Sequence, residues 1–149
     1  MKKFNIKVIL QLMGILLLFN GGFMLISALV SLYYDDGALE GILLAGIVTM
    51  TLGLILLFAT KGFKKSIKKR ECYLVVSLGW ISMSLSGALP YMFSGSIPSF
   101  TDDFFETMSG YTTTGASILQ DIEIIPRSIL FWRSTTHWIG GMGIIVLAI

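Results

Sequence analysis

The chain has 149 residues and a formal net charge of +2; 54% of its residues are hydrophobic and only 13% are charged. Its mean hydropathy of +0.81 is well above what a soluble domain of this length needs to fill a core. The composition therefore excludes an ordinary soluble protein and indicates that lipid surrounds most of the chain.

Three stretches contain no charged side chain: residues 9–34, 41–60 and 73–93. Each is long enough to cross a bilayer, which takes about 20 apolar residues. A fourth apolar run begins near Ser128 and continues to residue 149 without a polar stop. We expect this last helix to be truncated and the chain to be a piece of a longer protein. The predicted fold class is an all-α integral membrane protein.

The charged residues of the connections indicate the orientation of the helices. Lysines precede the first helix, and the second connection contains six cations in ten residues. These are Lys2, Lys3 and Lys7, followed by Lys61, Lys64, Lys65, Lys68, Lys69 and Arg70. By the positive-inside rule the N-terminus and this loop are cytoplasmic, and residues 94–127 are external. Residues 1–70 are thus predicted to be a two-helix N-terminal membrane segment with a basic cytoplasmic loop. Topology alone explains the basic loop, so no nucleic-acid partner is predicted.

The external connection begins with a segment that is patterned as a short helix. Thr101 is the expected N-cap, and Asp102 and Asp103 lie in the first turn, where the helix dipole favours carboxylates. Three apolar residues recur at intervals of four and are expected to form a packed face: Phe100, Phe104 and Met108. The helix is expected to end at Gly110.

A polar strand follows this helix, with the sequence Thr-Thr-Thr-Gly-Ala-Ser at 112–117. Such clusters are also common in ordinary turns, and that alternative stays open. The position between a short helix and a membrane helix favours a re-entrant pore loop, because non-helical backbone at membrane depth must line a cavity. The C-terminal end of the short helix would stabilise a cation such as K⁺, held by backbone carbonyls in place of water. Gly115 allows backbone angles that threonine resists.

Three motifs occur together in the C-terminal half of the chain. They are Gly-Tyr-Thr-Thr-Thr-Gly-Ala-Ser at 110–117, Ile-Leu-Phe-Trp-Arg at 129–133 and His-Trp-Ile-Gly-Gly-Met-Gly-Ile-Ile-Val-Leu-Ala at 137–148. Together they closely resemble the first repeat of the TrkH and TrkG membrane subunits of Trk-type potassium transporters. The resemblance covers the whole chain. It implies a potassium-channel-like protein in which one polypeptide carries four helix–pore loop–helix repeats around a central pore.

By this resemblance residues 71–149 form the first pore repeat. Its parts are an outer helix at 72–93, a pore helix at about 100–110, a filter at 111–117 and an incomplete inner helix at about 128–149. The resemblance implies that K⁺ is the transported ion and that four residues coordinate it: Thr112, Thr113, Thr114 and Gly115. Potassium-channel filters continue with Tyr-Gly, whereas this loop has Ala116 and Ser117. A looser outer half and less strict selectivity are therefore expected.

The implied function is potassium uptake across the bacterial cytoplasmic (inner) membrane by a multi-pass protein. The implied partners are membrane lipid, the remaining pore repeats of the same polypeptide, a second copy in a homodimer, and a cytoplasmic TrkA-type nucleotide-binding regulatory subunit. No enzymatic activity is expected.

Several polar residues around the loop have two interpretations. Arg133 either anchors the inner helix at the external interface or pairs with Glu106. Asp121 and Glu123 either concentrate cations at the pore mouth or lie on a solvated face. His137 is expected to be interfacial or hydrogen-bonded rather than a proton relay or metal ligand. Three glycines of the inner helix are expected to allow close helix approach: Gly140, Gly141 and Gly143.

Two rival functions come from other classes. An intramembrane hydrolase using Ser109 or Ser117 with His137 lacks a nucleophile elbow and a third group that orients the histidine. A small membrane scaffold or accessory protein without transport activity remains the alternative. A single repeat cannot surround an ion with carbonyls on four sides, so the residues present are expected to need further repeats.

Overall fold

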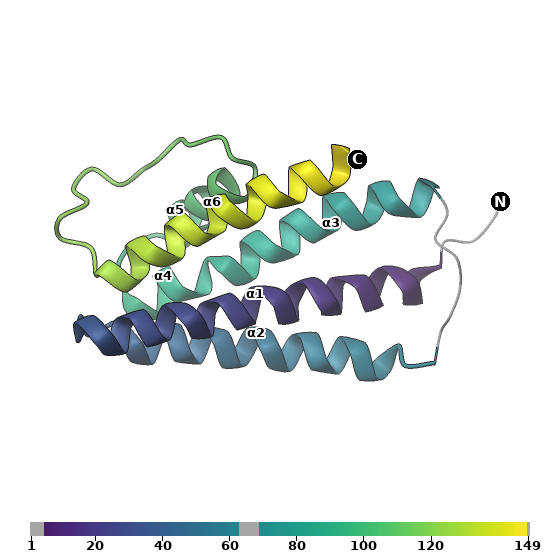
Figure 1. Cartoon of the computed structure of the whole chain (residues 1–149), viewed down its shortest axis with the longest axis horizontal. Helices are drawn as coiled ribbons and strands as arrows, with labels where there is room; N and C mark the ends of the chain where they lie inside the picture. Colours follow the sequence, from purple (N-terminus) through teal and green to yellow (C-terminus); the bar gives the residue numbers. More distant parts are fainter. Residues whose placement is uncertain (1–4, 63–68, 149) are drawn as a thin grey trace.

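The computed structural model describes residues 5–62 and 69–148, and within these ranges the chain is helical with irregular connections (Figure 1). The helices are α1 (Ile6–Tyr34), α2 (Leu39–Ala59), α3 (Lys69–Gly87), α4 (Leu89–Ser94), α5 (Phe100–Tyr111) and α6 (Arg127–Ala148). Five lysines of the predicted cytoplasmic side lie outside the described residues: Lys2, Lys3, Lys64, Lys65 and Lys68.

Three segments of the described chain are long and apolar enough to cross a membrane: α1, α2, and residues Glu71–Ser94, which combine most of α3 with α4. They correspond to the three uncharged stretches of the sequence. α6 is 22 residues long but is not among these spans, because its first half carries Arg133, His137 and several hydroxyl side chains.

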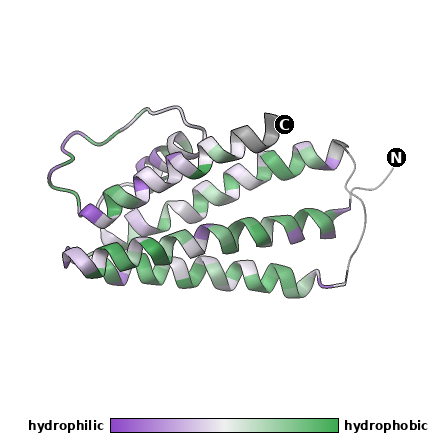
Figure 2. Ribbon diagram, in the orientation of Figure 1, coloured by the Kyte–Doolittle hydropathy of each residue, from purple (hydrophilic) through white to green (hydrophobic). Residues whose placement is uncertain are grey.

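The long helices lie side by side, with α1 in contact with α2, α3 and α6 (Figure 1). Apolar residues cover most of α1 and α2 (Figure 2). Many of these apolar side chains point outward; Leu29, Leu32 and Phe58 are each more than 60% exposed. An apolar surface on this scale suits a lipid environment and is unusual for a soluble monomer.

Small residues let α1 and α2 approach closely. A Cβ added at Gly14 would lie 3.0 Å from the carbonyl oxygen of Gly53, and one added at Gly53 would lie 2.9 Å from that of Gly14. Such contacts between glycines bring helix backbones together in membranes, where packing rather than water drives association. α1 and α2 therefore form a tightly packed antiparallel pair.

The segment expected as one outer helix at 72–93 is divided into α3 and α4. Ala88 separates them, and Pro90 lies in the first turn of α4. Proline has no N–H and its ring crowds the preceding turn, so it favours the start of a helix over its interior. Helical bonding nonetheless continues across the junction: Ala88 N donates to Ser84 O at 3.0 Å, and Met92 N to Ala88 O at 3.1 Å.

The short helix α5 begins where the sequence predicts, but the expected N-cap was wrong. Ser99 has extended backbone angles, φ −123° and ψ 127°. Its carbonyl accepts hydrogen bonds from the N–H groups of Asp102 and Asp103, each at 3.0 Å. The helix therefore starts at Phe100, and Thr101 lies inside its first turn.

The predicted packed face of α5 was right only in part: Phe104 and Met108 are partly buried, and Ser84 Oγ lies 3.4 Å from the sulfur of Met108. Phe100 is half exposed, and the residues that face the protein are mainly polar: Asp103, Glu106, Thr107, Ser109, Gly110 and Tyr111. A membrane protein can expose its apolar side chains to lipid, so hydrophobic periodicity does not mark the buried face of such a helix. The buried polar face instead meets α3 and α6.

Candidate functional site

The connection after α5 starts with a compact helix-ending motif. Thr113 N donates to Gly110 O at 2.9 Å, and Thr114 N donates to Ser109 O at 3.0 Å. These two bonds are the pair that defines a Schellman motif. α5 therefore ends at the threonines, and the partially negative end of its dipole faces the loop.

Two residues of the loop have left-handed backbone angles. Gly115 has φ 77°, which confirms that this position uses the freedom of glycine. Thr113 has φ 54°, a value that β-branched residues rarely adopt. The motif usually carries glycine at this position, and the sequence pattern gave no sign of the strained threonine.

The threonine side chains bond within the loop and back to α5. Thr112 Oγ1 donates to Met108 O at 2.7 Å and lies 2.8 Å from Thr114 Oγ1. Thr113 Oγ1 donates to Thr112 O at 2.8 Å. Ser109 Oγ donates to Ala116 O at 2.6 Å. The loop is thus tied to the end of α5, while residues 113–118 are exposed.

Glu106 lies behind the loop and connects it to α6. Its carboxylate is fully buried. It accepts a hydrogen bond from Ile118 N at 3.0 Å, contacts Ser117 Oγ at 3.2 Å with both oxygens, and pairs with Nε of Arg133. Arg133 therefore pairs with Glu106, which is one of the two interpretations that the sequence left open. One carboxylate therefore links α5, the far end of the loop and α6.

α6 also contacts the end of α5 through its backbone. A Cβ added at Gly140 would lie 2.2 Å from the carbonyl oxygen of Tyr111, and one added at Gly110 would lie 2.3 Å from Thr136 Oγ1. Among the described residues, Gly143 has no such neighbour within 4 Å, and Gly141 has only Thr113 Cγ2 at 3.9 Å. The expected close approach is therefore confirmed for Gly140 and is not seen at the other two glycines.

Other predicted residues lie apart from this cluster. Asp121 and Glu123 are exposed, and Asp121 Oδ1 accepts from Glu123 N at 3.1 Å. Within the described ranges no hydrogen bond or ion pair joins either of them to residues 112–115. His137 Nδ1 lies 3.0 Å from Arg133 O on its own helix, a hydrogen-bonded position. Among the described residues, no three His, Cys, Asp or Glu side chains are grouped so that they could hold a metal ion.

Two polar contacts across the bundle were not predicted. Asp36, in the α1–α2 connection, accepts a hydrogen bond from Ser128 N at the start of α6, at 2.8 Å. Asn20, in the middle of α1, accepts a hydrogen bond from the hydroxyl of Tyr111. The partners are separated by 92 and 91 residues, so local pattern could not pair them. The sequence feature that could have indicated the second contact is Asn20 itself, a single asparagine within the uncharged stretch 9–34.

The outward apolar faces, the buried polar side chains and the three candidate spans define an all-helical multi-pass membrane protein. Residues 39–149 match the sequence model of the TrkH family, described as cation transport protein. The chain belongs to this TrkH family of cation transport proteins, which are transporters and not enzymes. The predicted all-α membrane fold and the family resemblance are confirmed.

Curated relatives are similar over almost the whole chain. It is 40% identical over 146 residues to the Trk system potassium uptake protein TrkH of Escherichia coli K12, and 30% identical to TrkG of the same organism. The crystal structure of the potassium transporter TrkH from Vibrio parahaemolyticus superposes with a TM-score of 0.91 at 37% identity, covering 97% of this chain and 31% of that one. The chain spans about 30% of the length of the curated relatives it matches.

Proposed function

We propose that this chain contributes the first ion-conducting repeat of a potassium uptake transporter. Residues 1–70 would be an N-terminal membrane segment and residues 71–149 the pore repeat. The backbone carbonyls of residues 112–115 would line the ion path. The observation that carries the proposal is the form of this loop: α5 ends on a Schellman motif at Thr113, and Gly115 turns the backbone with φ 77°.

The geometry suits a dehydrated cation. K⁺ crosses a membrane only if other oxygens replace its water shell, and carbonyls of an irregular strand can do so. α5 aims its partially negative end at that strand. The threonine hydroxyls and the Glu106–Arg133 pair hold the strand in place from behind. The ion would therefore meet a loop whose shape is fixed before binding.

One repeat cannot complete this coordination, because the carbonyls must surround the ion. The remaining repeats of the same polypeptide would supply the other sides, in keeping with relatives that are about three times as long. A homodimer and a cytoplasmic TrkA-type nucleotide-binding subunit would complete the assembly in the bacterial inner membrane.

The proposed orientation puts the N-terminus in the cytoplasm and the loop after α5 toward the outside. Asp121 and Glu123, exposed on the connection that follows the loop, would raise the local cation concentration at the mouth. Substituting both with amides would lower uptake at low external K⁺ more than at high K⁺.

The test uses a chimera in which this chain replaces the matching segment of the Escherichia coli TrkH. It is expressed in cells without other K⁺ uptake systems, and K⁺ and Na⁺ uptake are measured. The chimera is expected to support K⁺ uptake. Gly115→Ser is expected to lower the K⁺/Na⁺ uptake ratio while expression is retained.

Gly37→Ser is the matched control. Gly37 has φ 76°, within a degree of Gly115, and at neither position does a described residue have an atom within 4 Å of an added Cβ. Both variants place a serine on a residue with nearly the same positive φ, and the two positions differ in their place relative to the proposed ion path. Equal selectivity in the two variants would refute the assignment of Gly115. A folded wild-type chimera without K⁺ uptake would favour the scaffold function.

A further inference from the structure

We propose that Asn20 of α1, outside the pore repeat, positions the ion-binding loop by holding Tyr111. The inference rests on the proposed function of residues 112–115. It assigns the N-terminal helices a part in selectivity in addition to membrane anchoring.

Asn20 is fully buried and uses both ends of its amide. Its Oδ1 accepts a hydrogen bond from the Tyr111 hydroxyl, and its Nδ2 donates to Ser86 Oγ at 2.9 Å and to Met83 O at 3.4 Å. The amide therefore joins α1 to α3 and to the last residue of α5. A buried amide is costly in an apolar helix unless it is bonded in this way.

Tyr111 directly precedes the threonine loop. Its backbone packs on Gly140 of α6, and its ring packs on Gly87 of α3, where an added Cβ would lie 3.0 Å from Cε2. Any tilt of Tyr111 would therefore be passed to the carbonyl of Thr112. The hydroxyl also lies against Gly87, and its hydrogen bond to Asn20 sets the direction in which the polar end of the side chain points.

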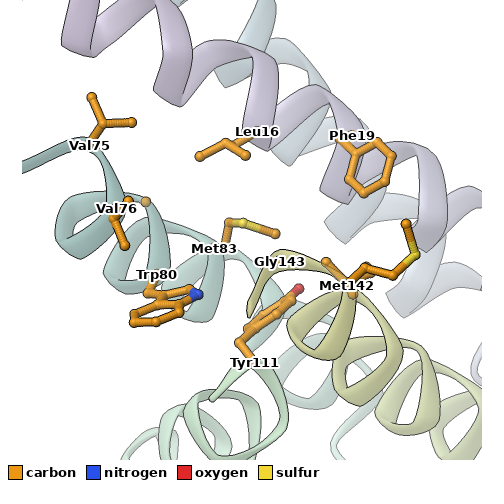
Figure 3. Close-up of a pocket in the computed structure, with 11 residues that line it drawn as sticks. Leu16, Phe19, Val75, Val76, Trp80, Met83, Tyr111, Met142 and Gly143 are labelled. Atoms are coloured by element: carbon orange, nitrogen blue, oxygen red, sulfur yellow. The ribbon is translucent and has the colours of Figure 1, made fainter. Parts of the chain in front are cut away.

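One side of the Tyr111 ring borders an apolar groove, although Tyr111 itself is buried. The groove, of about 340 Å³, lies between α1, α3 and α6, and Tyr111 lines it together with Leu16, Met83 and Trp80 (Figure 3). Packing density resists side-chain motion only where neighbouring atoms are in contact. The apolar contacts of Tyr111 with Met83 and Ile139 have no preferred direction. The hydrogen bond to Asn20 therefore adds a restraint on the orientation of the hydroxyl that apolar packing does not supply.

The experiment compares three variants in the chimera: Asn20→Leu, Tyr111→Phe and the double variant. Tyr111→Phe removes one hydrogen bond, and Asn20→Leu removes that bond together with those to Ser86 and Met83. A drop of about fivefold in the K⁺/Na⁺ uptake ratio is expected in each single variant. Each single variant also leaves a buried polar group unpaired and should lower the melting temperature. In the double variant neither member of the Asn20–Tyr111 pair remains, so stability should recover.

The K⁺/Na⁺ uptake ratio of the double variant shows whether Asn20 positions the loop or only stabilises the fold. If Asn20 positions the loop, the double variant regains stability while its uptake ratio stays low. If Asn20 only stabilises the fold, the ratio returns together with stability, and the inference is overturned. Ser27→Ala is the matched control, because Ser27 is buried on the same helix and bonds only to Phe23 O of that helix in the described contacts.

The outcomes also separate this inference from the proposed function. Normal selectivity in both single variants, alongside a defective Gly115→Ser, overturns the role of Asn20 and leaves the proposed ion path standing. Selectivity that does not respond to Gly115→Ser contradicts the proposed ion path and the inference built on it. Tyr111→Phe changes a single atom and keeps the test valid if Asn20→Leu fails to fold.

Discussion

The backbone of Tyr111 packs directly on Gly140: a Cβ added at Gly140 would lie 2.2 Å from the Tyr111 carbonyl oxygen. Backbone cannot yield as a flexible side chain can, so Gly140→Ala should push α6 away from the end of α5. We expect a cost of about 1–3 kcal/mol, typical of overpacking. The melting temperature of the purified chimera and its K⁺ uptake should both fall.

Gly143→Ala is the control for this prediction. It makes the same substitution about one turn further along α6, at a position where no atom of the described part of the chain lies within 4 Å of an added Cβ. Alanine is also the better helix former by about 1 kcal/mol. Gly143→Ala should therefore be neutral or stabilising. An equal loss in both variants would show that helix flexibility, and not the contact with Tyr111, explains the effect.

Removal of Arg133 should be severe, because it leaves the fully buried carboxylate of Glu106 without its cation. Breaking a buried pair from one side costs about 3–5 kcal/mol. Arg133→Met is expected to reduce the yield of folded protein sharply. Adding Glu106→Gln removes the uncompensated charge and keeps an acceptor for Ser117 and Ile118, so the double variant should recover part of the loss.

Arg127→Met controls for the loss of a cation on α6. Arg127 is exposed, and its guanidinium lies 4.9 Å from the centroid of the Tyr34 ring. A contact of that kind is worth about 0.5–1 kcal/mol at an exposed site. An equal fall in the yield of folded protein in Arg127→Met and Arg133→Met would show that the Arg133–Glu106 pair does not hold the loop. The same conclusion would follow if Glu106→Gln did not raise the yield of Arg133→Met.

The helices could be predicted from the sequence because lipid imposes strong constraints. Uncharged runs of about 20 residues have few alternatives to a membrane helix. The sequence also predicted that Gly115 uses backbone angles that threonine resists, and its φ of 77° agrees. The pairing of Arg133 with Glu106 was foreseen as one of two possibilities, since both lie near the same loop in sequence.

The missed features depend on tertiary structure. The buried face of α5 was predicted from the spacing of its apolar residues, a rule that assumes that water surrounds the protein. In the structure Phe100 is half exposed and Asp103 is buried. Neither carboxylate oxygen of Asp103 has a hydrogen-bond partner among the described residues, a feature that composition cannot reveal. The contact between Asn20 and Tyr111 requires α1 to lie beside the end of α5, which local pattern cannot specify.

The strained backbone of Thr113 predicts a conflict between stability and selectivity. Its φ of 54° is unfavourable for a β-branched residue, so Thr113→Gly should stabilise the fold by about 1 kcal/mol. The same change removes the hydroxyl that bonds Thr112 O and loosens the loop. The melting temperature should rise while the K⁺/Na⁺ uptake ratio falls.

Asp35→Gly serves as the control, since Asp35 is another residue with positive φ, at 49°, and it ends α1 away from the loop. It should be stabilising or neutral and leave the uptake ratio unchanged. A Thr113→Gly variant with unaltered selectivity would show that the strain at this position has no part in ion choice.

The link between Asp36 and α6 should make stability depend on pH. Burial acts to raise the pKa of this carboxyl, but interactions with Ser128 and Ser31 and with the backbone N–H groups of Ser128 and Ala38 hold the pKa below its ordinary value of 3.8. The folded state thus favours the carboxylate. Its contribution is complete above the unfolded pKa of about 3.9 and is lost as the pH falls through the folded pKa.

Asp36→Asn should therefore lower stability by about 1 kcal/mol near pH 7, the usual worth of a helix cap, because Ser128 N loses a charged acceptor at the start of α6. The gap in melting temperature between wild type and Asp36→Asn should be constant down to about pH 5 and shrink below about pH 4, where protonation removes the same charge. Glu123→Gln, at an exposed carboxylate, controls for the general effect of losing a negative charge. A gap that stays constant down to about pH 3 would mean that the charge of Asp36 does not stabilise α6, and that the contact acts through shape alone.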